Sequence, residues 1–441
     1  MKVKILCLLL LTVATTLCAD NGRLSVTFIA KNAVRIRYVA NNIKAPSDSL
    51  PDWIYPDRPK TGHADISVAI NRKKGTVTVK DKGGRVVFRA TKHQLRADTV
   101  AGRATQEATL TFANQKGEWM YGLGQFQDGQ SNVRGLARRL TQVNTQISLP
   151  LVISNKGYGV LWNNYGLTEF NPCKTFVKMN KGNEQGAKEV VEVTTTEGGK
   201  QEVRQDNIFS AALPITEEGD YTLLLDVGQR MARKHNLMVD GNTVIDQQNL
   251  WLPPTVSTIV HLTKGTHQVK ALLTQGDNPT LYYNKVGNTT TFSSPVANAV
   301  DYTVFVGSPD EIIAAYRQAT GPAPRMPRWA LGYIHCRERF HSSDEILATA
   351  RRFKAEHLPV DMFVQDWQYW GRYGWNAMRF DEKYYPDPKA LTDSLHAMGY
   401  RMMLSVWSKI DRKSEVGRKM QDGNYYIPAQ FNSSVFGAWL R

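Results

Sequence analysis

The hydrophobic pattern of the chain changes near Pro322, and this change limits the folds that the chain can adopt. Before it, short runs such as AVRIRYVA, GTVTVK and GGRVVFRA alternate apolar with polar residues, and turns with Gly or Asn separate them. After it, short and almost wholly apolar runs alternate with stretches of helical periodicity. The first pattern is typical of antiparallel sheets with one face in solvent, and the second of a parallel sheet covered by helices.

The first pattern predicts two β domains. We expect residues 20–195 to form a β-sandwich. The block 196–290 contains a second set of strands, in GDYTLLLDVG, LMVDGNTVID and LTKGTHQVKALL, with a hairpin tip at Asp240–Asn242. Residues 291–320 then return to a strand, VDYTVFVG, and lead on as a linker. The second block is therefore predicted to be an all-β insertion within the sandwich.

The second pattern, over residues 321–441, predicts strands that alternate with helices. The strands are expected in WALGYIHC, PVDMFVQDW and RMMLSVW. Ser342 and Glu345 form a capping box at the start of the first helix, and Asp387 caps the second. Such a sheet is parallel, and functional side chains gather at the C-terminal ends of its strands.

Charge and cysteine content exclude several classes of function. The formal charge is +15, but the basic residues are spread along the chain without a nucleic-acid-binding motif, so no nucleic-acid partner is expected. Beyond the N-terminal segment only Cys173 and Cys336 remain. Their separation favours neither a zinc site nor a disulfide framework, and both are predicted to be small buried side chains. We expect no metal ion and no cofactor.

The N-terminal segment 1–19 has the layout of a secretory signal peptide. Lys2 and Lys4 precede an apolar run, which is too short to span a bilayer, and small residues follow it. Cleavage is expected near Cys18 or Ala19. The chain is thus predicted to be secreted, periplasmic or associated with an outer membrane; membrane attachment would require a lipid on Cys18, and this alternative stays open.

The stretch VQDWQYWG contains the candidate binding residues at the end of the second predicted strand. Asp366 is followed closely by Trp367, Tyr369 and Trp370. A carboxylate can accept hydrogen bonds from neighbouring sugar hydroxyls while an aromatic ring stacks on the apolar face of the sugar. In the alternative interpretation, Asp366 caps the loop and the rings are packing.

Other residues near the strand ends have weaker claims to a binding role. Trp407 is either a further pocket wall or a core residue. Glu338 is predicted to pair with the arginines beside it, and His335 to be a satisfied core or rim histidine. Asp381 and Asp387 fit turn and helix-cap roles.

Several of these segments resemble glycoside hydrolase family 31. They are PRMPRWALGYIHCRERF, VDMFVQDWQYWG, FDEKYYPDPKALTDSLHAMGYRMMLSVW and, at Tyr121–Gln125, YGLGQ. Within the family they look most like secreted α-xylosidases that act on xyloglucan, and the inserted block resembles a PA14 domain. The resemblance implies a (β/α)8 TIM barrel in which Asp366 holds hydroxyl groups of the sugar in the cleaved subsite, with Trp367 as pocket wall.

The resemblance also implies a retaining exo-acting mechanism with two reacting carboxyl groups. The family places the nucleophile at the end of the fourth barrel strand, so this chain is expected to hold only the first three units, and both reacting groups are expected beyond Arg441. We therefore interpret the chain as C-terminally truncated and inactive alone. Sugar-binding PA14 members carry two adjacent aspartates that chelate calcium, whereas here Val227 follows Asp226.

The function predicted from the sequence is that of an α-xylosidase fragment acting on xyloglucan-type oligosaccharides. Asp366, Trp367, Trp370 and Trp407 are the predicted substrate-binding residues. The alternatives are an α-glucosidase of the same family and a secreted carbohydrate-binding protein.

Overall fold

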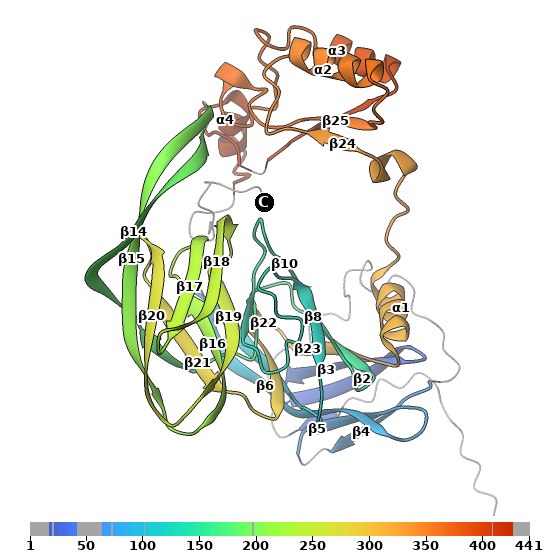
Figure 1. The fold of residues 1–441 in the computed structure, drawn as a ribbon. Helices are drawn as coiled ribbons and strands as arrows, with labels where there is room; N and C mark the ends of the chain where they lie inside the picture. The colour runs from blue at the N-terminus through green and yellow to red at the C-terminus, as the bar shows by residue number, and fades with distance from the viewer. Residues whose placement is uncertain are drawn as a thin grey trace, which may run out of the picture. The chain divides into compact units, whose positions relative to one another are not determined.

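The computed structural model describes residues 17–19, 22–41, 64–71, 74–100, 102–195, 198–407 and 409–426 (Figure 1). The chain divides into two compact units, with the main boundary between Pro322 and Ala323. The first unit holds all the antiparallel sheets, and the second holds a parallel sheet with its helices. The predicted signal peptide lies outside the described residues except for Leu17–Ala19, which pair with the next strand.

The first unit begins with two seven-stranded antiparallel sheets that face each other. The first sheet contains, in spatial order, β1 (Leu17–Ala19), β2 (Gly22–Ala30), β3 (Ala33–Ala40), β23 (Val300–Val306), β11 (Tyr158–Trp162), β10 (Ile147–Ser154) and β8 (Met120–Gln125). The second contains β4 (Ser67–Asn71), β5 (Thr76–Lys80), β6 (Val86–Val100), β7 (Arg103–Ala113), β22 (Thr289–Ala297), β12 (Thr168–Phe170) and β9 (Arg138–Leu140).

Aromatic side chains from both sheets fill the space between them. Phe88 contacts Phe112 and Tyr158 at ring distances of 5.2 and 5.5 Å, and Trp162 stacks on Phe292 at 6.0 Å. All five are buried in one cluster. Because alternate residues of each strand point inward, the sequence pattern predicts this two-layer arrangement.

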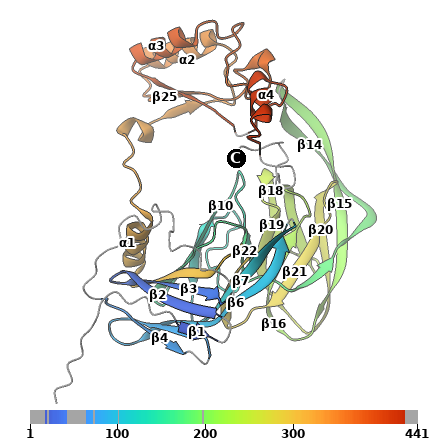
Figure 2. The same ribbon diagram turned by 180° about the vertical axis from the view of Figure 1, so that it is seen from behind.

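A second pair of antiparallel sheets forms the inserted domain, which lies beside the sandwich (Figure 2). One sheet contains β13 (Thr175–Lys178), β21 (Thr280–Lys285), β16 (Gly219–Asp226) and β19 (Thr255–Leu262). The other contains β14 (Asn180–Thr195), β15 (Gly198–Ile215), β20 (Gly265–Thr274), β17 (Ala232–Val239) and β18 (Asn242–Leu252). Leu223, Leu237, Ala271 and Leu281 are fully buried between the sheets.

The insertion enters and leaves the sandwich at neighbouring strands. β12 pairs with β22 in the sandwich, and β13 pairs with β21 in the insertion, so the two crossing segments run side by side. The inserted sheets therefore begin at Thr175, earlier than the predicted boundary at 196, and their last strand ends at Lys285. The alternating pattern continues through both domains, so it does not tell which sheet a strand joins.

Helix α1 (Pro309–Thr320) occupies much of the segment predicted as a linker. Ser308 and Glu311 form a capping box at its start. Its buried residues Ile312, Ala315 and Ala319 form a cluster with residues of the first sheet. The helix therefore belongs to the sandwich unit.

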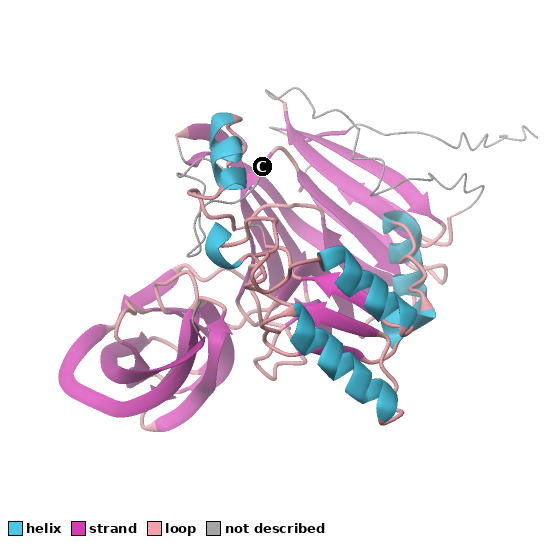
Figure 3. Ribbon diagram, turned by 90° about the horizontal axis from the view of Figure 1, so that it is seen from above, coloured by secondary structure: helices cyan, strands magenta, loops and turns pink. Residues whose placement is uncertain are grey.

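The second unit contains a three-stranded parallel sheet in the order β24, β25, β26. Its elements are η1 (Arg328–Leu331), β24 (Ile334–Cys336), α2 (Ser343–Ala355), β25 (Met362–Gln365), η2 (Gly371–Tyr373), α3 (Pro388–Ala397), β26 (Arg401–Leu404) and α4 (Glu415–Asp422). Helices α2 and α3 lie next to each other on one face of the sheet (Figure 3). The alternation predicted from the sequence is thus present, although the strands are shorter than predicted and WALGYIHC begins as a 3-10 helix.

The helix starts agree with the sequence in their N-caps. Ser342 Oγ accepts a hydrogen bond from Glu345 N at 3.2 Å, and Asp387 accepts one from Ala390 N at 2.9 Å. The carboxylate of Glu345 bonds His341 N rather than the N-cap backbone, so the predicted reciprocal capping box is only half formed. No helix in the described part of the chain is long and apolar enough to cross a membrane.

Candidate functional site

The parallel sheet brings the ends of its strands to one edge. Cys336, the last residue of β24, pairs with Val364 of β25, and Gln365 pairs with Leu404 of β26. Asp366 follows directly after β25. As the sequence predicts, this aspartate lies at the C-terminal edge, where parallel α/β sheets hold their ligands.

Asp366 is a half-buried carboxylate without a partner. Among the residues that the structure describes, its side-chain oxygens make no hydrogen bond and no ion pair. The interpretation of Asp366 as a loop cap is therefore not supported, since a cap would accept a backbone N–H. A free carboxylate can accept hydrogen bonds from hydroxyl groups of a ligand.

The thiol of Cys336 reports the position of this charge. Burial raises the pKa of Cys336, and the negative charge of Asp366 raises the pKa further. Cys336 is nevertheless exposed and Cys173 is half-buried, so the prediction that both are buried is wrong. Burial, with the charge of Glu169, raises the pKa of Cys173 to about 12, so this thiol stays protonated near neutral pH.

The aromatic residues around Asp366 pack against one another. Trp367 and Trp370 are 6% and 2% exposed. Trp375 lies 5.6 Å from Trp367, 5.4 Å from Trp370 and 5.3 Å from the half-buried Trp407, measured between ring centroids. This geometry favours packing for Trp367 and Trp370, and their contact with a sugar stays a prediction.

Sequence reasoning missed the central ring of this cluster, Trp375, and the residue after it. Asn376 is fully buried, and its Nδ2 donates to the carbonyl oxygens of Trp407 and, at 3.1 Å, Lys409. The amide thus links the loop after β25 to the segment after β26. The density of rings in the sequence could have pointed to Trp375, whereas nothing in the local pattern marks Asn376.

Asp381 holds the loop between β25 and α3 in shape. Its carboxylate accepts hydrogen bonds from the backbone N–H groups of Arg372 and Lys383, each at 3.1 Å, and it is 3% exposed. Its own N–H donates to Tyr369 O at 2.8 Å. The predicted turn role of Asp381 is confirmed, and the loop that follows Asp366 is fixed by a buried side chain.

A buried hydrogen-bond network lies beneath the strand edge. Gln365 is fully buried; its Oε1 accepts from Tyr385 Oη at 3.0 Å, and its Nε2 donates to Phe340 O at 3.3 Å. Tyr385 Oη also lies 2.8 Å from Phe340 O. The network joins the loop after β24 to the end of β25 and thereby orients the residue next to Asp366.

His335 has the role predicted for a satisfied rim histidine. Its Nδ1 lies 2.9 Å from Tyr333 Oη, and its ring lies 4.8 Å from that of Phe353. Burial, with the charge of Arg337, lowers the pKa of His335. A neutral imidazole held by rings has no proton to give near neutral pH.

The arginines near the end of β24 do not pair as predicted. Arg337 pairs with Glu345 of α2 at 2.9 Å instead of with Glu338. The guanidinium of Arg339 lies over the ring of Trp367, at 5.2 Å from its centroid. The predicted ion pair at Glu338 was wrong because the helix brings a better-placed carboxylate to the strand end.

The site as described can bind but has no second carboxylate placed to react. Within the described ranges there is also no group of three or more His, Cys, Asp or Glu side chains that could hold a metal ion. Asp366 is thus the one residue among the predicted four that combines a polar group with free hydrogen-bonding capacity.

Comparison with known proteins identifies the second unit. Residues 323–441 match the family described as "Glycosyl hydrolases family 31 TIM-barrel domain". An "Alpha-xylosidase" of Saccharolobus solfataricus is 26% identical over 425 residues, which covers 91% of this chain and 42% of the relative.

Two crystal structures of α-xylosidases have a similar fold. One, from Xanthomonas citri, has a TM-score of 0.76 and 20% identity and covers 97% of this chain and 53% of that one. The other, from a soil metagenome and complexed with xylose, has a TM-score of 0.60 and 21% identity and covers 93% of this chain and 48% of that one. The chain thus spans about half the length of these proteins.

Proposed function

Because the chain belongs to glycoside hydrolase family 31 through residues 323–441, we propose that it is part of a retaining α-xylosidase. Relatives named as α-xylosidases support this proposal. The observation that carries it is the half-buried carboxylate of Asp366, which lies at the C-terminal end of β25 and has no partner among the described residues.

In this proposal Asp366 binds the sugar and does not react. Its two oxygens accept hydrogen bonds from neighbouring hydroxyls of the pyranose in the cleaved subsite and so hold the ring in place. A retaining enzyme needs a nucleophile and an acid/base roughly 5 to 5.5 Å apart. We place both beyond Arg441, in line with the share of its relatives that the chain spans.

The substrate that we propose is a terminal α-xylosyl group of a xyloglucan-type oligosaccharide. The alternative substrate, an α-glucoside, adds one hydroxymethyl group, and a pocket discriminates such a group by about 1 to 3 kcal/mol. Trp367 and Trp370 occupy space beside Asp366 and would favour the smaller sugar. A third alternative is a carbohydrate-binding protein without catalysis.

Turnover by the whole protein that contains this chain tests the proposal. We expect hydrolysis of an aryl α-xyloside with a higher kcat/KM than that of the aryl α-glucoside. Asp366→Asn should lower kcat/KM by about 100-fold or more, because a charged acceptor for two hydroxyls is lost. Asp393→Asn is the matched control, since Asp393 lies exposed on α3, paired with Lys389, and should leave kcat/KM unchanged.

Turnover of neither glycoside would refute the enzymatic proposal. Calorimetry with xyloglucan oligosaccharides then decides about a binding protein, and a flat titration of the 441-residue chain would remove that alternative as well. A loss of activity in Asp393→Asn equal to that in Asp366→Asn would mean that Asp366 has no special role.

We also propose that the inserted domain is of the PA14 type and that residues 1–19 direct export. The two sheets of the insertion support the first proposal. Mass spectrometry of the mature N-terminus tests the second: a start close to Cys18 or Ala19 is expected, and a lipid would appear as added mass on Cys18. An intact N-terminus after expression in a secreting host would contradict it.

A further inference from the structure

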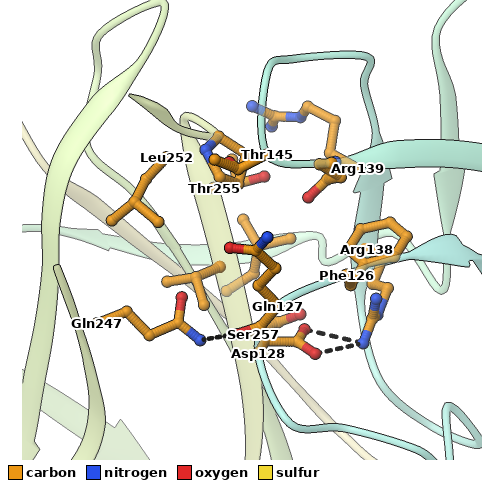
Figure 4. A pocket seen from close by; sticks show the side chains of 14 residues that line it. Phe126, Gln127, Asp128, Arg138, Arg139, Thr145, Gln247, Leu252, Thr255 and Ser257 are labelled. Carbon is orange, nitrogen blue, oxygen red and sulfur yellow. Dashed lines mark hydrogen bonds and ion pairs between the residues drawn. The ribbon is translucent and has the colours of Figure 1, made fainter. Parts of the chain in front are cut away.

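A hollow opens between the β-sandwich and the inserted domain, within the first unit. Figure 4 shows side chains of the sandwich on one side and of the insertion on the other, with Gln127 between them. The empty space measures about 400 Å³, counting the part that is open to solvent. Ligand pockets begin at about 300 Å³, so the hollow has room for one small molecule and not for a long chain buried whole.

The two walls of the hollow are bonded to each other. Thr145 Oγ1 of the sandwich donates to Trp251 O of the insertion at 2.6 Å. Gln247 Nε2 of the insertion donates to Gln127 O of the sandwich at 3.0 Å. Because these contacts fix one domain against the other, the hollow is preformed, and a ligand would not have to order its walls.

Three polar side chains in the hollow have unused hydrogen-bonding capacity. Gln127, Thr255 and Ser257 line it, and none of their side chains bonds to another residue in the described part of the chain. Thr255 and Ser257 are only 7% and 4% exposed. Neither hydroxyl belongs to the fully enclosed unpaired atoms, so both face the open space. Buried hydroxyls without a protein partner are normally satisfied by water or by a ligand.

The charges around the hollow cancel. Arg138 pairs with Asp128 at 2.8 Å, and Arg139 pairs with Asp226 at 2.7 Å. Neither arginine is therefore available to a phosphate, and neither carboxylate to a cation. Charge complementarity thus favours an uncharged ligand that can form many hydrogen bonds.

We propose that this hollow binds one neutral pyranose unit of a glycan, at a site separate from Asp366. The amide of Gln127 and the hydroxyls of Thr255 and Ser257 bond the ring hydroxyls, while the buried side chains of Leu252 and Val256 contact its apolar C–H face. The exposed Gln127 side chain turns aside to admit the ring. The inserted domain thereby helps to hold the glycan.

Calorimetry and protein-observed NMR on the full chain test this proposal. The probes are D-xylose, D-glucose, a xyloglucan oligosaccharide and sodium sulfate, and Asp366→Asn is used throughout to remove the first site. We expect weak binding of a neutral sugar. Thr255→Val with Ser257→Ala should weaken it by about tenfold, as the loss of one or two hydrogen bonds implies, while Thr258→Val, on the same strand but outside the hollow, should leave it unchanged.

The outcomes that overturn the proposal are equally concrete. They are a flat titration with every sugar, an affinity that the double variant leaves unchanged, and preferential binding of sulfate. If the double variant does not fold, Gln127→Ala replaces it, because Gln127 is exposed; Gln130→Ala is its matched control. Failure here would leave the proposal for Asp366 untouched, because that site is tested by turnover.

Discussion

The guanidinium of Arg139, on β9 of the sandwich, lies 2.7 Å from the carboxylate of Asp226, at the end of β16 in the inserted domain. The two side chains are 23% and 18% exposed, and Glu169 is a second partner of Arg139 at 3.3 Å. Asp226 lies where the resemblance to PA14 domains led us to consider a calcium ligand. Its charge instead joins the insertion to the sandwich.

Removing this ion pair should destabilise the first unit. We expect Asp226→Asn to lower the free energy of unfolding by about 1 to 3 kcal/mol, because a mostly buried guanidinium loses a charged acceptor. Denaturant titration measures the loss, and a double-mutant cycle with Arg139→Gln gives the coupling. Lys285→Gln is the control: its pair with Glu217 is 36% and 74% exposed and should be worth less than about 1 kcal/mol. Equal losses in both variants would contradict this role.

Acid should destabilise the protein through His93. Its Nδ1 lies 3.0 Å from Gly75 O and its Nε2 lies 2.9 Å from Tyr302 Oη, so the neutral ring can donate to the carbonyl and accept from the phenol. Burial lowers the pKa of His93 from 6.5 to about 4. The unfolded chain therefore binds more protons between these values, and stability is complete above pH 6.5 and falls as the pH approaches 4.

The size of this effect is roughly 2 to 3 kcal/mol for His93, allowing for its partial exposure. Unfolding titrations from pH 7 to pH 4 measure it, and His93→Gln should remove this part of the pH dependence. Burial also lowers the pKa of His235 to about 4, so the variant should retain a second, similar loss. An identical pH profile in wild type and His93→Gln would refute the prediction.

The loop after Asp366 should not tolerate a side chain at Gly371. Its φ is +46°, and an added Cβ would collide with the carboxylate of Asp381. We expect Gly371→Ala to cost more than about 2 kcal/mol, from backbone strain plus the loss of a buried hydrogen-bonded position. Gly399→Ala is matched, since its φ is also positive but nothing lies within 4 Å, and should cost about 1 kcal/mol. Hydrogen exchange of the loop distinguishes them; equal protection in the two variants would contradict the prediction.

The two interpretations of the tryptophans make different predictions for Trp370→Phe. As a core residue that is 2% exposed, Trp370 should lose about 1 to 3 kcal/mol of unfolding free energy on truncation, because a cavity is left. Sugar affinity should stay near that of the wild type. A loss of affinity of about tenfold or more without a loss of stability would instead identify Trp370 as a pocket wall.

Much of the fold could be predicted from periodicity and capping residues. The alternating runs predict the strands of the β domains, and Asp387 predicts the start of α3. The tip at Asp240 and Gly241 is a tight hairpin with φ values of 48° and 82°, as two residues suited to positive φ indicate. These features depend on neighbours in the sequence, which is why the sequence alone predicts them.

The candidate site divides in the same way. That Asp366 follows a buried strand could be predicted, since only the local pattern is involved. That its carboxylate is free, while Trp367 and Trp370 are buried, could not, because burial depends on Trp375 and on segments that the chain brings in later.

The sequence by itself determined which segments are strands and helices, and it placed an aspartate at the end of a parallel strand. Only the tertiary structure decided where the insertion begins, because strand pairing between β13 and β21 involves residues about a hundred positions apart. It also decided that Asp226 bonds Arg139 and that a hollow forms between two domains. Such contacts depend on distances in space, which a pattern along the chain does not contain.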